Sequence, residues 1–295
     1  MDIEMKVKEP INRVTRKQKL KNYSRHPGSF LLALLTKLAI LLTVLALGFI
    51  LIYILVKGIP NLSTDLFALK YTTENVSMLP AIINTLIITL LSLCIAGPIG
   101  IFSAIYLVEY AKKGNKLVEV VRVTAETLTG IPSIVYGLFG MLFFVTTLKC
   151  GYSLLAGALT LSIMVLPVIM RTTEEALLAV PNSFREGSFG LGAGKLRTIF
   201  KIVLPSAVPG ILAGVILAIG RMVGETAALI YTAGTVAEIP SSIMSSGRTL
   251  AIHMYSLSKE GLYTNQAYAT AVVLLIVVVL INMLSNFVAK KFTKK

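Results

Sequence analysis

The chain has 295 residues, of which 55% are hydrophobic and only 14% are charged. A soluble domain carries about 25% charged residues, so this composition excludes an ordinary soluble protein and indicates one that lies in a membrane. The formal net charge is +14, but the basic residues gather at the two ends and in alternate loops, which argues against a nucleic-acid partner.

The first 29 residues form a polar, basic tail that ends where a long apolar segment begins. That segment is too long for the apolar part of a signal peptide, so we do not interpret the tail as a targeting sequence. A basic tail beside a membrane helix favours contact with acidic lipids on the cytoplasmic side. Nucleic-acid binding is the alternative that such a tail leaves open.

Six apolar segments follow, each a candidate to cross a bilayer, whose core needs about 20 residues of helix. They are Phe30–Val56, Leu79–Val108, Leu128–Leu148, Ser153–Met170, Pro205–Ala233 and Ala267–Ala289. The sequence therefore predicts an all-α fold, a polytopic bundle of about six transmembrane helices in a lipid bilayer.

The loops between these segments alternate in charge, which predicts how the chain is oriented. Most basic residues lie in the tail, in residues 109–122 and 171–204, and at the C-terminus. By the positive-inside rule, both termini and residues 171–204 face the cytoplasm. The long loop 234–265 then lies outside, with a short amphipathic helix at Leu250–Leu257. It is either a gate or docking surface, or a cover over the bundle.

The third apolar segment is interrupted by Gly130 and Pro132. Proline removes a backbone donor and glycine weakens a helix, so we predict a kink here. Backbone groups freed at membrane depth are tolerated where helices pack together or line a cavity.

A polar, glycine-rich stretch separates the fourth and fifth segments. Its first part, Pro181–Phe189, is predicted to be a short helix that Asn182 or Ser183 caps. Such a helix lies on the membrane surface, because it is too polar to enter the bilayer.

Three glycines then break this helix and let the chain turn: Gly190, Gly192 and Gly194. A helical pattern resumes over Leu196–Val203, and Pro205 begins the fifth apolar segment. The resulting helix–turn–helix is suited to docking into another protein.

The run Gly190–Lys195 looks like part of a phosphate-binding loop. A Walker A motif would also need Gly at position 189 and Ser or Thr at 196, where this chain has Phe189 and Leu196. No metal-ligand cluster or catalytic triad is visible, and the only histidines are His26 and His253. We therefore predict no catalytic residue and no metal site, and we place any ATP hydrolysis on another chain.

The fifth segment carries two Gly-x-x-x-Gly patterns, Gly210 with Gly214 and Gly220 with Gly224. Each pattern predicts a place where helices approach closely, because glycine has no side chain to keep them apart.

Arg221 lies about sixteen residues after Pro205, deep in the fifth segment. An arginine there costs at least about 2.5–3.5 kcal/mol, so it must face a cavity or a partner. One hypothesis is an anion path, because a guanidinium matches an oxyanion and stays charged. The other is a structural pair with Glu225, one turn away on the same face. Arg171, where the fourth segment reaches the cytoplasm, is either the inner end of that path or a solvated helix end.

Part of the glycine-rich stretch resembles the EAA loop of permeases in type I ABC importers. The matching residues are Glu186, Gly187, Ser188, Gly192, Ile202, Leu204 and Pro205, with Gly187-Ser188 where the family favours Ala-Ala. Three further stretches, Gly130–Gly137, Leu166–Ala176 and Gly220–Ala227, resemble the PstA family of phosphate transport permeases. The resemblance covers roughly residues 75–290.

The resemblance implies a MetI-like fold and the role of a transmembrane permease subunit, in an ATP-driven importer of inorganic phosphate in a prokaryotic cell membrane. It implies three partners: a second permease subunit like PstC, a dimer of ATPase subunits like PstB, and an external phosphate-binding protein like PstS. This chain would bind no cofactor, since the ATPase uses the ATP.

The resemblance also assigns roles to residues. The coupling loop, residues 181–205, would contact the ATPase through Arg185, Glu186, Gly187, Ser188, Gly192, Leu204 and Pro205. Arg221, Glu225 and Arg171 become candidates for the substrate path.

We divide the chain into the basic tail (1–29), a first transmembrane helix with its external loop (30–72), a permease core (73–290) and a basic C-terminal end (291–295). Two other functions remain open. A permease for another oxyanion, such as molybdate or sulfate, would share the EAA loop. A secondary transporter or channel without an ATPase would show inverted repeats or paired broken helices, and no clear internal repeat is visible.

Overall fold

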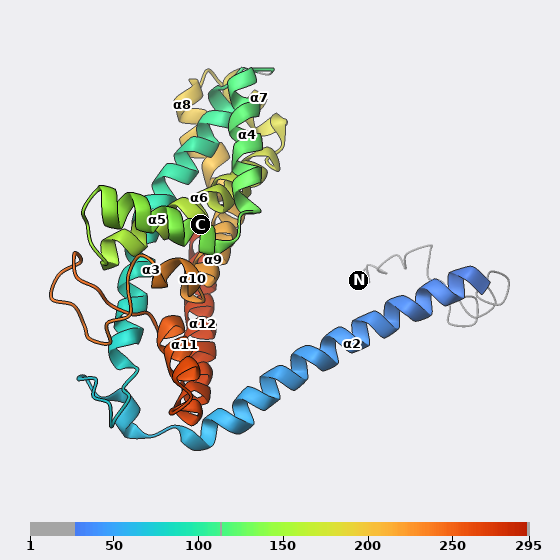
Figure 1. Ribbon diagram of the computed structural model, residues 1–295. Helices are drawn as coiled ribbons and strands as arrows, with labels where there is room; N and C mark the ends of the chain where they lie inside the picture. The colour runs from blue at the N-terminus through green and yellow to red at the C-terminus, as the bar shows by residue number, and fades with distance from the viewer. Residues whose placement is uncertain (1–26, 113, 294–295) are drawn as a thin grey trace, which may run out of the picture. The chain divides into compact units, whose positions relative to one another are not determined.

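The computed structural model describes residues 27–112 and 114–293, which fold into helices and connecting loops without a strand (Figure 1). Most of the predicted basic tail, residues 1–26, and the last two lysines lie outside the described residues. The chain divides into two compact units, Met1–Ile54 and Leu55–Lys295.

The helical elements follow one another along the described part of the chain. In order, they are α2 (Pro27–Gly58), η1 (Ile59–Asn61), η2 (Thr64–Phe67), α3 (Leu79–Ile105), η3 (Tyr106–Tyr110), α4 (Lys116–Thr129), α5 (Ser133–Gly140), η4 (Met141–Thr147), α6 (Leu154–Leu178), α7 (Asn182–Gly190), α8 (Lys195–Thr198), η5 (Ile199–Val203), α9 (Leu204–Val223), α10 (Ala227–Ile230), α11 (Leu250–Glu260) and α12 (Thr264–Thr293).

Helix α2 contains the first predicted membrane segment, and most of it belongs to the first unit. It is apolar on every side, and its large side chains are exposed from Phe30 to Val56. A helix that is apolar all round suits a lipid environment.

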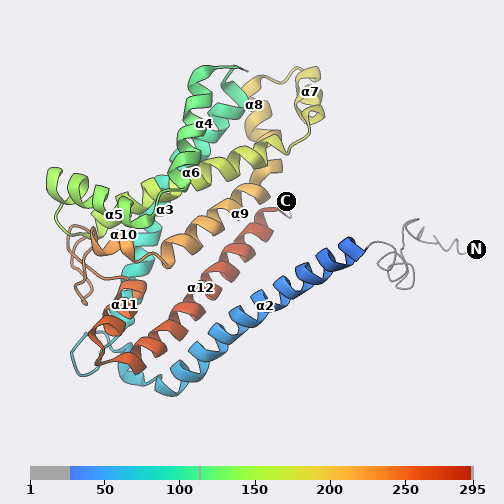
Figure 2. The ribbon, with the colours of Figure 1, turned by 45° about the vertical axis from the view of Figure 1, so that its right-hand side comes forward.

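The second unit is built around α6, which packs against α3 and α9, while α12 packs along α9 (Figure 2). Leu161 and Met164 of α6 are fully buried among Ile88 of α3 and Met222 of α9. Close contact between α3 and α6 needs Gly100, because a Cβ there would lie 3.0 Å from the side chain of Ile169. The core is therefore formed by the faces that these helices turn toward one another.

Serine side chains also join α3 to α6. The Ser92 hydroxyl donates to the Ala158 carbonyl at 3.1 Å, and the Ser162 hydroxyl donates to the Ser92 carbonyl at 3.2 Å. Small polar side chains of this kind hold membrane helices together at short distance.

Within the described residues, five helices are long and apolar enough to cross a membrane, and a bent pair makes a sixth if it counts as one span. This confirms the predicted fold class. The expected third span, Leu128–Leu148, is broken in the structure: α4 and α5–η4 form a pair that is bent by 104°. The bend arises because Pro132 has no N–H and disfavours helical geometry at Ile131, while Gly130 ends α4. The predicted kink at these two residues is thus confirmed.

Two other predicted spans end elsewhere. The fourth continues eight residues beyond Met170, since α6 ends at Leu178, and the fully buried Thr173 and Leu177 keep this polar end packed. The fifth does not reach Ala233, because α9 ends at Val223 and the short α10 follows. Hydropathy alone could not locate this end, because the chain stays apolar across the break.

Three π-helical segments occur in the described chain, in which an N–H group bonds to the carbonyl five residues back. They are η3 after α3, η4 after α5, and η5 before α9. In η5, for example, the Leu204 N–H donates to the Ile199 carbonyl. Segments η3 and η5 both border the α7–α8 region.

The predicted amphipathic helix of the 234–265 loop is confirmed as α11. Its apolar side is packed into the second unit, with Ile252 and Leu257 fully buried. Leu250 at its start joins Met78 and Ala269 in a small core cluster. This packing favours the cover over the bundle, one of the two interpretations of the loop.

A buried aromatic and basic cluster surrounds α11. The rings of His253 and Tyr71 meet edge to face at 6.2 Å, and the Arg248 guanidinium lies 4.6 Å from the centre of the same tyrosine ring. Neither ring nitrogen of His253 has a hydrogen-bond partner in the described structure. Burial, and then the positive charge of Arg248, lower the pKa of His253 from 6.5 to about 3, while the Val76 backbone opposes this shift.

His253 therefore makes stability depend on pH. In the folded protein it stays neutral down to about pH 3, whereas in the unfolded chain it takes up a proton below about pH 6.5. The contribution of His253 to the free energy of unfolding is present in full above pH 6.5 and is lost as the pH falls. At pH 5 the loss is about 2 kcal/mol.

We expect the substitution His253→Leu to reduce the drop in melting temperature that the detergent-purified protein shows between pH 7 and pH 5. An unchanged drop would contradict this origin.

Candidate functional site

The glycine-rich stretch folds as a hairpin, α7–turn–α8, which we call the coupling hairpin (residues 181–205). Helix α7 ends in a Schellman motif: the Gly192 N–H donates to the Phe189 carbonyl at 2.9 Å, and the Ala193 N–H donates to the Ser188 carbonyl at 3.1 Å. Gly192 has φ +80°, which is left-handed backbone. The predicted turn is confirmed at Gly192, while Gly190 still belongs to α7.

The predicted cap of this helix is wrong. The residue before α7 is Pro181, and no side chain caps its first turn. Asn182 lies inside the helix, where its Oδ1 accepts from Nη1 of Arg185 at 3.5 Å. The Asn182 side chain therefore bonds to Arg185, and not to the free backbone N–H groups at the start of α7 as the capping pattern predicts.

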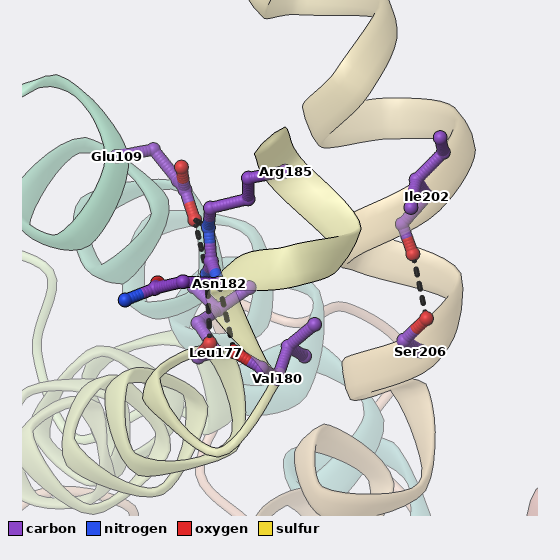
Figure 3. A network of polar contacts seen from close by, with 7 residues as sticks. All are labelled: Glu109, Leu177, Val180, Asn182, Arg185, Ile202 and Ser206. Carbon is purple, nitrogen blue, oxygen red and sulfur yellow. Dashed lines mark hydrogen bonds and ion pairs between the residues drawn. The ribbon is translucent and has the colours of Figure 1, made fainter. Parts of the chain in front are cut away.

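Arg185 fastens the coupling hairpin to the bundle (Figure 3). Its Nη2 and Nε lie 2.7 and 3.0 Å from Oε1 of Glu109 in η3. The guanidinium also donates to the carbonyls of Leu177 and Val180, at 2.9 and 2.8 Å. The two charged side chains are only 15% and 9% exposed. Sequence reasoning missed Glu109, because 76 residues separate it from its partner.

A second contact closes the hairpin on itself. The hydroxyls of Ser188 and Thr198, both buried, lie 2.8 Å apart and join α7 to α8. At the junction with α9, the Ser206 hydroxyl donates to the Ile202 carbonyl at 2.7 Å (Figure 3). Arg185 and Ser188 therefore have structural roles in addition to any contact with a partner.

The outer surface of the hairpin carries the remaining residues of the predicted coupling set. Glu186, Gly187 and Pro205 are exposed, and Leu204 is partly buried at the start of α9. Large apolar side chains accompany them, with Leu191 91% and Leu196 65% exposed. Exposed apolar groups that cluster with charge are typical of a protein-docking surface.

Replacing Gly192 by valine should disrupt this hairpin. A β-branched residue at φ +80° costs about 1–3 kcal/mol, because its Cβ clashes with the local backbone. We expect binding of the ATPase that the family resemblance implies to fall severalfold for the detergent-purified variant, while membrane insertion persists. Gly190→Val is the matched control, since Gly190 is helical and a Cβ there meets no atom within 4 Å. Equal binding by the two variants would count against the turn.

Arg221 lines a pocket of about 700 Å³ between α9 and α12. Asn282 and Asn286 of α12 lie on the opposite wall, and Val168 of α6 and apolar residues of α9 complete the lining. The guanidinium is partly buried, and no ion pair joins it to any acidic residue in the described part of the chain. The pocket thus combines one uncompensated positive charge with two amides.

Glu225 does not share a helical face with Arg221, so that prediction is wrong. Helix α9 ends at Val223, and the Glu225 carboxylate accepts from the Ala228 N–H at 3.2 Å, at the start of α10. The physical reason is that a free N–H group at a helix start attracts a nearby carboxylate.

The first glycine pair packs closely and the second does not. A Cβ at Gly210 would lie 2.6 Å from the Cβ of Ala176, and one at Gly214 would overlap Thr172, so α9 touches α6 here. Gly220 has no such neighbour and lines the Arg221 pocket instead. Gly224 ends α9, which makes it a break and not a packing site.

Arg171 lies in a different pocket, of about 250 Å³, between α4 and α6. It contacts Glu175 at 3.1 Å and Glu126 at 3.6 Å, while Arg122 contacts Glu174 at 2.6 Å. Three carboxylates thus compensate the two arginines. The structure does not bring Arg171 together with the Arg221 pocket.

The bundle of membrane-length helices with a surface hairpin defines a polytopic membrane protein. Residues 96–295 match the family described as binding-protein-dependent transport system inner membrane component. The chain belongs to this family, and it is a multi-pass membrane protein.

Curated relatives agree with this assignment. The phosphate transport system permease protein PstA of Pasteurella multocida is 36% identical over 269 residues, which is 87% of this chain and 92% of that protein. The probable ABC transporter permease protein YqgI of Bacillus subtilis is 32% identical over 261 residues, covering 82% and 88%. The predicted resemblance to the PstA family is confirmed.

Solved structures show the same fold. A bacterial alginate ABC transporter matches with a TM-score of 0.67 and 16% identity, over 94% of this chain and 99% of that one. The MetNI methionine ABC transporter, in an inward-facing conformation, matches with a TM-score of 0.56 and 20% identity, over 82% and 98%. The fold is therefore that of a MetI-like ABC importer permease.

Proposed function

We propose that this chain is the permease subunit of an ATP-driven importer of inorganic phosphate. The observation that carries the proposal is Arg221, a permanent cation without a carboxylate partner in a pocket between two membrane helices. A guanidinium offers paired donors that match the oxygens of phosphate. The relatives named as phosphate permeases support the same substrate.

Membership of the family supports a set of partners for this chain. We propose that a second permease like PstC completes the pore, that an ATPase dimer like PstB binds the coupling hairpin, and that a protein like PstS delivers phosphate from outside. The exposed Leu191 and Leu196 support docking at the hairpin, because apolar side chains gain stability when a partner covers them. ATP hydrolysis takes place on the ATPase, and this chain supplies no catalytic residue.

The mechanism is alternating access. Closure of the ATPase dimer on ATP moves the docked hairpin. Arg185 transmits that motion to η3 through Glu109, and to the end of α6 and the turn after it through the Leu177 and Val180 carbonyls. Helix α9 is continuous with the hairpin through η5, and its movement changes the side of the membrane from which the Arg221 pocket is accessible. Phosphate moves inward when the ATPases reset.

The test is uptake by proteoliposomes that contain the four proposed components. With labelled phosphate, sulfate and molybdate offered separately, we expect ATP-dependent accumulation of phosphate and at most slight uptake of the others. Accumulation of molybdate or sulfate in place of phosphate would assign another oxyanion. Uptake that persists without the ATPase would contradict an ABC importer and favour a channel or secondary transporter.

The orientation of the chain is a separate proposal, which rests on the positive-inside rule. Reporter fusions after Lys70 and near Ser245 should read as external, and a fusion after Gly192 should read as cytoplasmic. An external signal at Gly192 would overturn both the orientation and docking to a cytoplasmic ATPase.

A further inference from the structure

Helix α12 carries two asparagines that its otherwise apolar sequence does not explain. Asn282 and Asn286 are four residues apart, so they lie on one face of the helix. Both belong to the membrane-length segment Thr264–Phe287. Neither side chain has a hydrogen-bond partner among the residues that the structure describes. A membrane helix keeps unpaired amides only where they face a cavity or a partner, because lipid cannot bond to them.

Both asparagines line the pocket that contains Arg221, Asn282 partly buried and Asn286 exposed. Three polar side chains from two helices therefore line one open pocket whose other lining residues are apolar or glycine, including Ile216 and Leu217 of α9. An apolar pocket with a few converging polar groups is the usual form of a small-ligand site. At about 30 Å³ per water molecule, a pocket of about 700 Å³ has space for an oxyanion with part of its hydration shell.

We propose that Asn282 and Asn286 are ligands of the transported oxyanion, which they hold together with Arg221 between α9 and α12. This inference deepens the proposed function and rests on it. Each amide supplies N–H donors for the anion oxygens without adding charge, and its carbonyl accepts from a protonated oxygen of the anion.

The composition of this site suits transport better than tight storage. A site on a transport path must bind strongly enough to admit its ion and weakly enough to release it. One guanidinium and two neutral amides meet both requirements, whereas a cluster of arginines would retain the anion. The amides therefore set how well the pocket receives the anion, while Arg221 supplies the charge.

The test uses the complete importer in proteoliposomes and measures anions transported per ATP hydrolysed. The variants are Asn282→Leu and Asn286→Leu, which keep a similar volume and remove the amide. Met283→Leu is the matched control, since Met283 is on the same helix, is exposed and does not line the pocket. We expect each asparagine variant to lower the ratio about tenfold, because a hydrogen bond to a charged group is lost, and Asn282→Gln to restore a large part of it.

The alternative is that the asparagines bind a helix of the second permease. In that case the leucine variants would reduce co-purification of the second permease and the ATPase activity of the assembled importer, and the proposed site would be overturned. A ratio equal to that of Met283→Leu would overturn it as well. If the wild-type importer transports an oxyanion other than phosphate, the same variants are measured with that anion, so the site is tested separately from the identity of the substrate.

Discussion

Arg221→Gln should reduce phosphate uptake about hundredfold while the protein still inserts into the membrane. The substitution removes the one full positive charge of the α9–α12 pocket and the paired donors that a phosphate would use. Arg221→Lys keeps the charge but loses the planar fork, so its uptake should fall between those of the wild type and the glutamine variant. The measurement is uptake of labelled phosphate, normalised to membrane-inserted protein.

The control for this prediction is the double variant Arg221→Gln with Glu225→Gln. If the two residues formed a structural pair, removing both charges would restore folding and transport. Because Glu225 bonds to the Ala228 N–H and forms no ion pair with Arg221, we expect no recovery. Near-normal uptake by the double variant would refute the role of Arg221 in the anion path.

Arg185→Met should release the coupling hairpin from the bundle. The change leaves the Glu109 carboxylate, which is 9% exposed, without its partner, and two backbone carbonyls lose their donor. Breaking such a buried pair costs about 3–5 kcal/mol. We expect faster hydrogen exchange across residues 181–205 and loss of ATPase binding, while α6 and α9 stay protected.

Two further variants separate charge from packing in that prediction. Glu186→Gln alters an exposed residue of the same helix and should leave hydrogen exchange unchanged. Arg185→Met combined with Glu109→Met removes the stranded carboxylate and should recover much of the protection, since apolar replacement of a buried pair is often tolerated. Equal exchange in the single and double variants would show that the ion pair does not hold the hairpin.

The parts of the fold that depend on average composition could be predicted from the sequence. Apolar length located the membrane helices, and the three glycines Gly190, Gly192 and Gly194 located the turn of the hairpin, of which Gly192 has the left-handed backbone. The ends of α6 and α9 could not be predicted in this way. A hydropathy window averages over many residues, whereas α9 ends because of local bonding at Gly224 and Glu225.

The candidate site was predictable only where a residue carried charge. Arg221 is conspicuous because a cation in an apolar helix is costly. Asn282 and Asn286 have no charge, and two amides barely alter the hydropathy of a segment as apolar as α12. Glu109 lies in η3 and Arg185 lies within α7, and neither charge is unusual there. Their pairing depends on how η3 and α7 approach each other in space, which sequence spacing does not encode.

The π-helical segment η5 has a consequence for how this hairpin tolerates insertions and deletions. A π turn takes up one residue more than an α turn, as if a residue had been inserted into a continuous helix from α8 to α9. Deleting one residue, such as Lys201, would let ordinary α-helical bonds close across the gap. Because the π turn absorbs the extra residue within a single turn, the helices on its two sides would keep nearly the same orientation around the axis of α9. The apolar surface of the hairpin would then keep its direction, whereas a deletion in the regular part of α9, where each residue turns the helix by about 100°, would turn that surface away.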